Sequence, residues 1–217
     1  MTVEQRVAET GLALRGGFRP VQADGLPSHV RTVVLVGDLG GRLWPYFNKT
    51  RRDEPDPLDN WTRRVLGAAA SDLGAGVLYP FDGPPYHPFQ QWAVRAEGLQ
   101  SSPIGPLMHP EYGLWHSYRG ALLFEQAFDL PPAFEAGHPC TTCRDRPCLS
   151  ACPVDAFKDG GDFDLDACLG HLGSPAGTPC MTGGCRARNA CPVARGHAYG
   201  PDHQAFLAQG FVSAFGS

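Results

Sequence analysis

All eight cysteines of this 217-residue chain lie between positions 140 and 191. The first run reads C-x2-C-x4-C-x3-C-P, and the last cysteine of the chain is again followed by proline. Two runs of thiolates, each closed by a Cys-Pro step, are typical of proteins that hold two iron–sulfur clusters. The sequence therefore predicts two 4Fe–4S clusters, with eight candidate ligands: Cys140, Cys143, Cys148, Cys152, Cys168, Cys180, Cys185 and Cys191.

The pairing of these cysteines follows from a rule of bacterial-type two-cluster folds. There, the first three cysteines of a run bind one cluster, and the cysteine before the proline binds the other. The rule assigns the first cluster to Cys140, Cys143, Cys148 and Cys191, and the second to Cys152, Cys168, Cys180 and Cys185. Some gaps are longer than usual, which leaves one three-iron or vacant site as an alternative. Zinc also takes four cysteines, so two zinc sites stay open, as do disulfides.

Composition and charge restrict the partners of the chain. The net charge is −4, which gives no basic field for a phosphate backbone, so we expect no nucleic-acid partner. No apolar run reaches the length of about 18 residues that a membrane-spanning helix needs. The first residues lack a signal segment. These observations favour a cytoplasmic protein that binds neither nucleic acid nor membrane.

The remaining two thirds of the chain alternate between helical and extended patterns. We expect strands near 32–37, 77–79 and 119–124, and helices from residue 56 or 59 to 73 and over 89–99, with weaker helical character over 3–15. This alternation predicts an α/β domain. Pro131-Pro132 mark a linker. The predicted domains are therefore residues 1–132, an α/β domain, and residues 133–217, a small domain of short helices around the cysteines.

Two further features have both a functional and an ordinary interpretation. The glycines at 37, 40 and 41 follow a strand, but an ordinary turn explains them better than a nucleotide-binding loop. His87 and His109 each precede a proline and lie beside aromatic residues. Proline forces the preceding residue out of helical geometry, so both histidines are expected on ordered loops. Such loops commonly line ligand sites, although packing and hydrogen bonding account for them equally well.

Two parts of the chain resemble known families. The core of the cblC-type cobalamin-processing protein is similar to two segments of this chain. One is 86–89, which reads Tyr-His-Pro-Phe, and the other runs from Met108 to Phe124. The second segment contains another His-Pro step and an Arg-Gly pair before an apolar strand. The cysteine-rich part, with two Cys-Pro steps and a lone cysteine in Ala-Cys-Leu-Gly-His-Leu, is similar to epoxyqueuosine reductase. Corrinoid reductive dehalogenases resemble both.

The resemblance implies a flavin-reductase-like α+β domain of the cblC type that binds cobalamin, next to a bacterial-type two-cluster 4Fe–4S ferredoxin domain. Cobalamin would be bound base-off, without its tail base on the lower face of the cobalt. Catalytic residues are not assigned. By position, the resemblance implies cofactor-binding roles for His87, His109, Tyr112, Gly113, Trp115 and Arg119.

The chain also departs from these families. Epoxyqueuosine reductase has an acidic residue in a pocket segment that corresponds to residues 100–103, which read Gln-Ser-Ser-Pro here. We also expect neither the tRNA-binding helical repeats of that enzyme nor the twin-arginine signal of the dehalogenases. We therefore expect no tRNA binding and no conversion of epoxyqueuosine.

The resulting hypothesis is an oxidoreductase that passes electrons from two 4Fe–4S clusters to the cobalt of a bound corrinoid, as a cobalamin reductase or processing protein. A separate electron-donor protein, a flavodoxin or a reductase, would supply the electrons. Two alternatives stay open: a cobalamin-dependent reductase of an unidentified small substrate, and a plain ferredoxin-type electron carrier for a partner enzyme.

Overall fold

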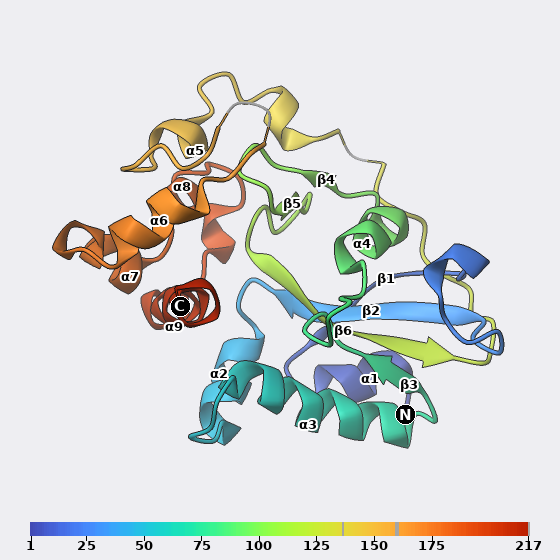
Figure 1. Ribbon diagram of the computed structural model, residues 1–217. Coiled ribbons are helices and arrows are strands. Elements are labelled where there is room, and N and C mark those ends of the chain that lie inside the picture. The colour runs from blue at the N-terminus through green and yellow to red at the C-terminus, as the bar shows by residue number, and fades with distance from the viewer. Residues whose placement is uncertain (136, 159–160, 217) are drawn as a thin grey trace. The chain divides into compact units, whose positions relative to one another are not determined.

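The computed structural model describes residues 1–135, 137–158 and 161–216, which form two compact units (Figure 1). The first unit contains Met1–Leu99 and His116–Glu135, and the second contains Gln100–Trp115 and the chain from 136 onward. The chain therefore passes from the first unit to the second twice. The predicted boundary at 132/133 lies near the second passage, but residues 100–115, which the sequence grouped with the N-terminal domain, belong to the cysteine-rich unit.

The first unit is built on a four-stranded antiparallel sheet with the order β1-β2-β6-β3 (Figure 1). The β-branched run at 32–36 explains the central place of β2, because its residues are buried on both faces of the sheet. The antiparallel pairing refines the expected α/β class to a mixed α/β unit with a small antiparallel sheet. The strands are β1 Ala13–Phe18, β2 Thr32–Leu39, β3 Gly76–Leu78 and β6 His116–Phe124.

Helices cover both faces of this sheet. In Figure 1, α4 lies on one face, and α1 and α3 lie on the other. Gly16 in β1 lets α4 approach closely, because a Cβ atom there would come within 2.6 Å of the carbonyl oxygen of Ala96. Trp61 of α3 and Trp92 of α4 are almost fully buried. The helices are α1 Val3–Ala8, α2 Leu43–Thr50, α3 Pro57–Asp72 and α4 Phe89–Glu97.

One predicted element of this unit is wrong in part. Helical character was expected over 3–15, but α1 ends at Ala8 and the chain enters strand β1 at Ala13. Gly11, with φ of 79°, makes the turn between them. Residues 13–18 form a strand because they pair with β2. Their own helical propensity is weak, since the segment contains Gly16 and Gly17. Helix α2 and strand β1 were both missed.

The second unit consists of a short hairpin and a series of short helices. The hairpin pairs β4 Gln100–Ser101 with β5 Leu107–Met108. Several helices begin with proline, which suits a first turn because its missing N–H is not needed there. The described helices are η2 Pro139–Thr141, α5 Pro147–Ser150, α6 Leu165–Leu172, η3 Pro175–Gly177, α7 Thr178–Gly183, α8 Arg186–Asn189, η4 Arg195–His197 and α9 Pro201–Phe215. None of the helices within the described ranges has the length and apolar character needed to span a bilayer.

Candidate metal centre

The structure brings four cysteines together around one hollow of the second unit. Cys140 lies on η2, Cys148 lies on α5, and Cys143 lies on the turn between them, while Cys191 follows α8. All four line the same hollow. Burial raises the pKa of the Cys140 thiol, and the thiols of Cys191, Cys148 and Cys143 raise it further. This is the set that the two-cluster rule assigns to the first cluster.

Apolar side chains surround this first group. Ile104, Met108 and Leu114 form a buried cluster with Cys148 and Cys191. These three residues come from the segment 100–115, so the hairpin serves as a cover for the cysteines. An apolar cover limits solvent access, which is one of the factors that set the reduction potential of a thiolate-held cluster.

The other four cysteines form a second group. Cys152 follows α5, Cys168 lies on α6, Cys180 lies on α7, and Cys185 immediately precedes α8. Burial raises the pKa of Cys168 to about 11, with added contributions from Cys185, Cys152 and Cys180. Each group therefore combines cysteines from both runs of the sequence.

The free thiols of both groups suit metal ligation. All eight cysteines are free thiols, so the disulfide interpretation is not supported. Burial and the neighbouring cysteines raise the thiol pKa of Cys140, Cys148, Cys168 and Cys185. The thiolate is the form that binds metal, so a bound cation would stabilise it. A zinc ion needs its four sulfurs about 2.3 Å away. Zinc therefore stays open as an alternative for each group of four cysteines.

The loop from His109 to Trp115 is fixed by its own contacts within the second unit. The Nδ1 atom of His109 accepts hydrogen bonds from the backbone N–H groups of Glu111 and Tyr112, both at 3.1 Å. His109 and Gly113 also exchange two backbone hydrogen bonds. A Cβ atom at Gly113 would lie 2.9 Å from the carbonyl oxygen of Val193, so glycine is needed for close packing there.

The aromatic residues of this loop are also engaged. The Tyr112 ring packs on the His197 ring at 4.5 Å, and buried Trp115 packs on Tyr199 at 5.5 Å. The guanidinium of Arg188 lies 4.7 Å from the Trp115 ring and donates a hydrogen bond to the carbonyl oxygen of Leu114. These contacts give each residue a structural role that does not involve a cofactor.

The other two residues assigned to cobalamin lie in the first unit. His87 stacks on Trp92 with ring centroids 5.7 Å apart. Arg119 pairs with Asp59 at 2.5 Å and donates to the hydroxyl of Thr62 at 3.0 Å. The six predicted cofactor-binding residues are thus divided between the two units, and their role toward cobalamin stays a prediction.

Replacing His109 by alanine tests the structural role. The change removes the acceptor of two backbone N–H groups, so we expect a loss of about 1–3 kcal/mol in the free energy of unfolding, measured by urea denaturation. His109→Asn, which keeps a side-chain acceptor, should lose less. A His109→Ala protein of unchanged stability that had lost affinity for cobalamin would instead support the cofactor-binding assignment.

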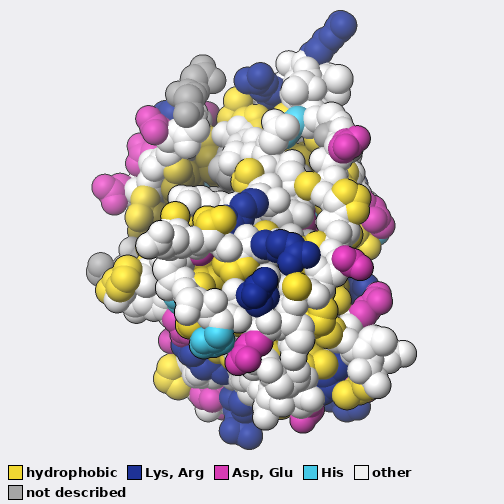
Figure 2. Space-filling view, turned by 90° about the vertical axis from the view of Figure 1, so that its right-hand side faces the viewer, with side chains coloured by type: hydrophobic (Ala, Val, Ile, Leu, Met, Phe, Trp, Pro, Cys, Tyr) yellow, Lys and Arg dark blue, Asp and Glu magenta, His cyan; other side chains and the backbone are white. Residues whose placement is uncertain are grey.

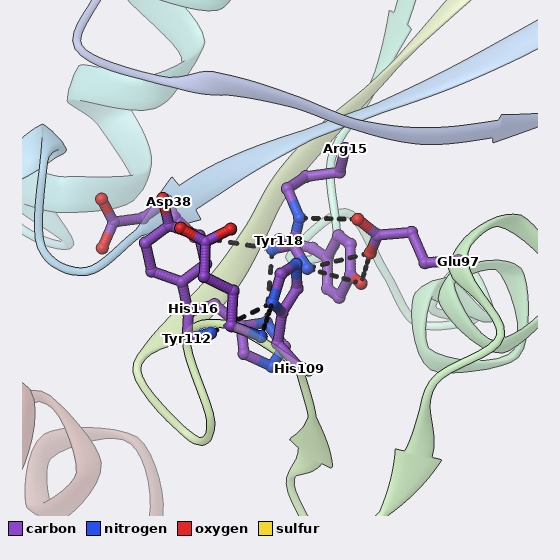
Figure 3. A network of polar contacts seen from close by, with 8 residues as sticks. Arg15, Asp38, Glu97, His109, Tyr112, His116 and Tyr118 are labelled. Atoms are coloured by element: carbon purple, nitrogen blue, oxygen red, sulfur yellow. Dashed lines mark hydrogen bonds and ion pairs between the residues drawn. The ribbon is translucent and has the colours of Figure 1, made fainter. Parts of the chain in front are cut away.

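Sequence reasoning missed a buried polar network in the first unit. The guanidinium of Arg15 on β1 forms two hydrogen bonds with the carboxylate of Glu97 on α4, at 2.9 and 2.8 Å. Figure 3 shows the Tyr118 hydroxyl directed at the same carboxylate and the His116 ring beside Arg15. Burial raises the pKa of Tyr118. Arg15 and Glu97 lie 82 positions apart, so only the fold brings them together.

Comparisons with known proteins identify the fold. No protein-family model matches this chain, and no curated protein matches it either. Among solved structures, epoxyqueuosine reductase from Streptococcus thermophilus is 14% identical and has a TM-score of 0.56 over 99% of this chain and 74% of that one. The enzyme from Bacillus subtilis is 14% identical with a TM-score of 0.52, over 99% of this chain and 76% of that one. The chain thus has an epoxyqueuosine-reductase-like fold.

The exclusion of a nucleic-acid partner is wrong. An epoxyqueuosine reductase of the same fold was solved with a tRNA stem loop; it is 14% identical, with a TM-score of 0.55 over 99% of this chain and 76% of that one. A protein of this fold therefore binds a nucleic acid, which overturns the exclusion. The prediction failed because a net charge says nothing of where charges lie. Figure 2 shows Lys and Arg side chains close together on one face of this acidic protein.

Proposed function

We propose that this protein is an iron–sulfur oxidoreductase whose two cysteine groups each hold a 4Fe–4S cluster and deliver electrons to a bound corrinoid. The observation that carries the proposal is the division of eight free thiols into two groups of four. Clusters of this kind supply one-electron transfer, at potentials set by hydrogen bonding and burial. A separate donor protein, a flavodoxin or a reductase, would reduce them in the cytoplasm.

The chain's own residues would bind and shield the clusters. Cys140, Cys143, Cys148 and Cys191 would hold the first cluster beneath the apolar cover from 100–115. The backbone N–H of Ala156 donates to the Cys152 sulfur at 3.4 Å, which would stabilise a thiolate in the second group. These contacts would order the ligands and limit the access of water to the first cluster.

The corrinoid part of this proposal rests on the resemblance to cobalamin-processing proteins. Its candidate residues are His87, His109, Tyr112, Gly113, Trp115 and Arg119, for which the fold supplies other contacts as well. A second candidate function is favoured by the neighbour with a tRNA stem loop: reduction of a modified nucleotide in RNA. The plain electron carrier remains the simplest alternative.

An absorption titration with hydroxocobalamin separates these functions. We expect a spectral shift that marks base-off binding, at a stoichiometry of one corrinoid per chain. Under the RNA-directed alternative, a gel-shift titration in about 0.15 M salt should also show binding of a tRNA stem loop. Binding of neither ligand by protein with full iron content would leave the electron carrier and contradict the corrinoid proposal.

A further inference from the structure

A second hollow in the cysteine-rich unit has the size of a small-molecule site. Its volume is about 440 Å³, within the range of roughly 300–1,000 Å³ typical of ligand pockets. His138 links two segments that line this hollow. The Nδ1 atom of His138 accepts a hydrogen bond from the backbone N–H of Cys140 at 3.1 Å, and the Nε2 atom lies 3.1 Å from the carbonyl oxygen of Ser101. The described lining residues include Gln100, Ser101, Ser102, Pro103, His138, Cys140, Thr141, Arg146, Leu149 and Lys158.

The fully charged side chains among the described residues of this lining are both positive. Arg146 and Lys158 line the hollow, and no Asp or Glu is among the described lining residues. Over the described part of the chain, neither cation has a carboxylate partner within 4.0 Å. Two cations that lack a carboxylate partner among the described residues are unexpected in one concave surface of a protein with a net charge of −4. Together they attract an anion.

Polar groups for orienting such an anion are also present. The Oγ atom of Ser102 is buried and has no hydrogen-bond partner among the described residues, although Ser102 lines the hollow. A buried hydroxyl without a partner is costly, at about 1–3 kcal/mol, unless a ligand or water satisfies it. Ser101 and Thr141 add two further hydroxyl-bearing residues to the lining.

We propose that this hollow binds the phosphate group of a small organic molecule. Arg146 suits bidentate contact with phosphate oxygens, and Lys158 supplies a second positive charge. The hollow shares Cys140 and Arg146 with the lining of the first cysteine group, so the bound molecule would lie next to that group. This inference goes beyond the proposed function, because it holds for any phosphate-bearing molecule, whether or not it is a corrinoid.

Calorimetric titration with inorganic pyrophosphate tests the site, using the full chain with its measured iron content at low ionic strength. We expect binding by the wild type and at least about tenfold weaker binding by the double variant Arg146→Gln/Lys158→Gln. Arg144→Gln removes one positive charge two positions from Arg146, as the single variant Arg146→Gln does, but Arg144 does not line the hollow. Arg144→Gln should therefore keep its affinity, and Arg146→Gln should lose part of it. The absence of wild-type binding, or an equal loss in the control, would overturn the proposal.

Competition experiments identify the source of the phosphate. Cobalamin carries a phosphodiester in its nucleotide loop, and cobinamide lacks it. Displacement of pyrophosphate by cobalamin but not by cobinamide would assign the site to the corrinoid. Displacement by neither, with pyrophosphate still bound, would assign it to another small phosphate and leave the inference intact. Equal displacement of pyrophosphate by cobalamin and by cobinamide would overturn the small-phosphate assignment. Displacement of pyrophosphate by a stem-loop RNA, with no displacement by AMP, would overturn it as well.

Discussion

Replacing Glu97 by glutamine is expected to cost about 3–5 kcal/mol in the free energy of unfolding of the first unit. The side chains of Arg15 and Glu97 are 1% and 6% exposed, so the variant would leave the guanidinium buried without a negative partner. The Tyr118 hydroxyl would also face a neutral amide in place of the carboxylate that now accepts its hydrogen bond. Urea denaturation followed by tryptophan fluorescence measures the change, because Trp61 and Trp92 are buried in this unit.

The same structure supplies a matched control for this prediction. Arg63 and Asp82 also form an ion pair, but their side chains are 44% and 34% exposed. Asp82→Asn should therefore change stability by less than about 1 kcal/mol. The apolar double variant Arg15→Met/Glu97→Leu should recover most of the lost stability, because it removes both charges together. If the Glu97→Gln protein were as stable as the Asp82→Asn protein, the buried Arg15–Glu97 pair would contribute no more to stability than an exposed pair, which would contradict the prediction.

Replacing Cys191 by serine is expected to remove the first cluster and spare the second. Cys191 belongs to the second run of the sequence, but it lines the hollow of Cys140, Cys143 and Cys148. A missing thiolate leaves that cluster with three strong ligands, so iron content should fall to about half and one electron paramagnetic resonance signal of the reduced protein should disappear.

The reciprocal change completes this test. Cys185 lies six positions before Cys191, yet its thiol adds to the raised pKa of Cys168 in the other group. Cys185→Ser should therefore abolish the signal that Cys191→Ser retains. If both variants lost the same signal, the division of the cysteines would be wrong, because neighbouring positions would then serve a single cluster.

The sequence was most informative where the spacing of particular residues along the chain restricts the fold. The two-cluster rule placed Cys152 with Cys168 and Cys140 with Cys191, and these cysteines lie near one another in the structure. Their role as cluster ligands stays a prediction. The β-branched run at 32–36 likewise predicted the central strand. In both cases the information is local: ligand loops and buried strands need particular residues at fixed intervals.

Other features depend on contacts that no local pattern encodes. Strand β1 contains Gly16 and Gly17 and is set by pairing with β2, so helical propensity over 3–15 was misleading. The Arg15–Glu97 pair joins distant segments. The segment 100–115 follows an α/β region in sequence but packs on the cysteines, because Ile104, Met108 and Leu114 bury their side chains there. The nucleic-acid exclusion failed because composition averages over the whole surface.

Iron and acid-labile sulfide analysis of anaerobically prepared protein tests the central claim most directly. Two 4Fe–4S clusters predict about eight iron atoms and about eight sulfides per chain, with the brown colour of such clusters. Mössbauer spectra should show all of the iron in cubane environments. A colourless protein that contained about two zinc ions per chain and no sulfide would contradict the account, because the two groups of four cysteines would then be structural zinc sites.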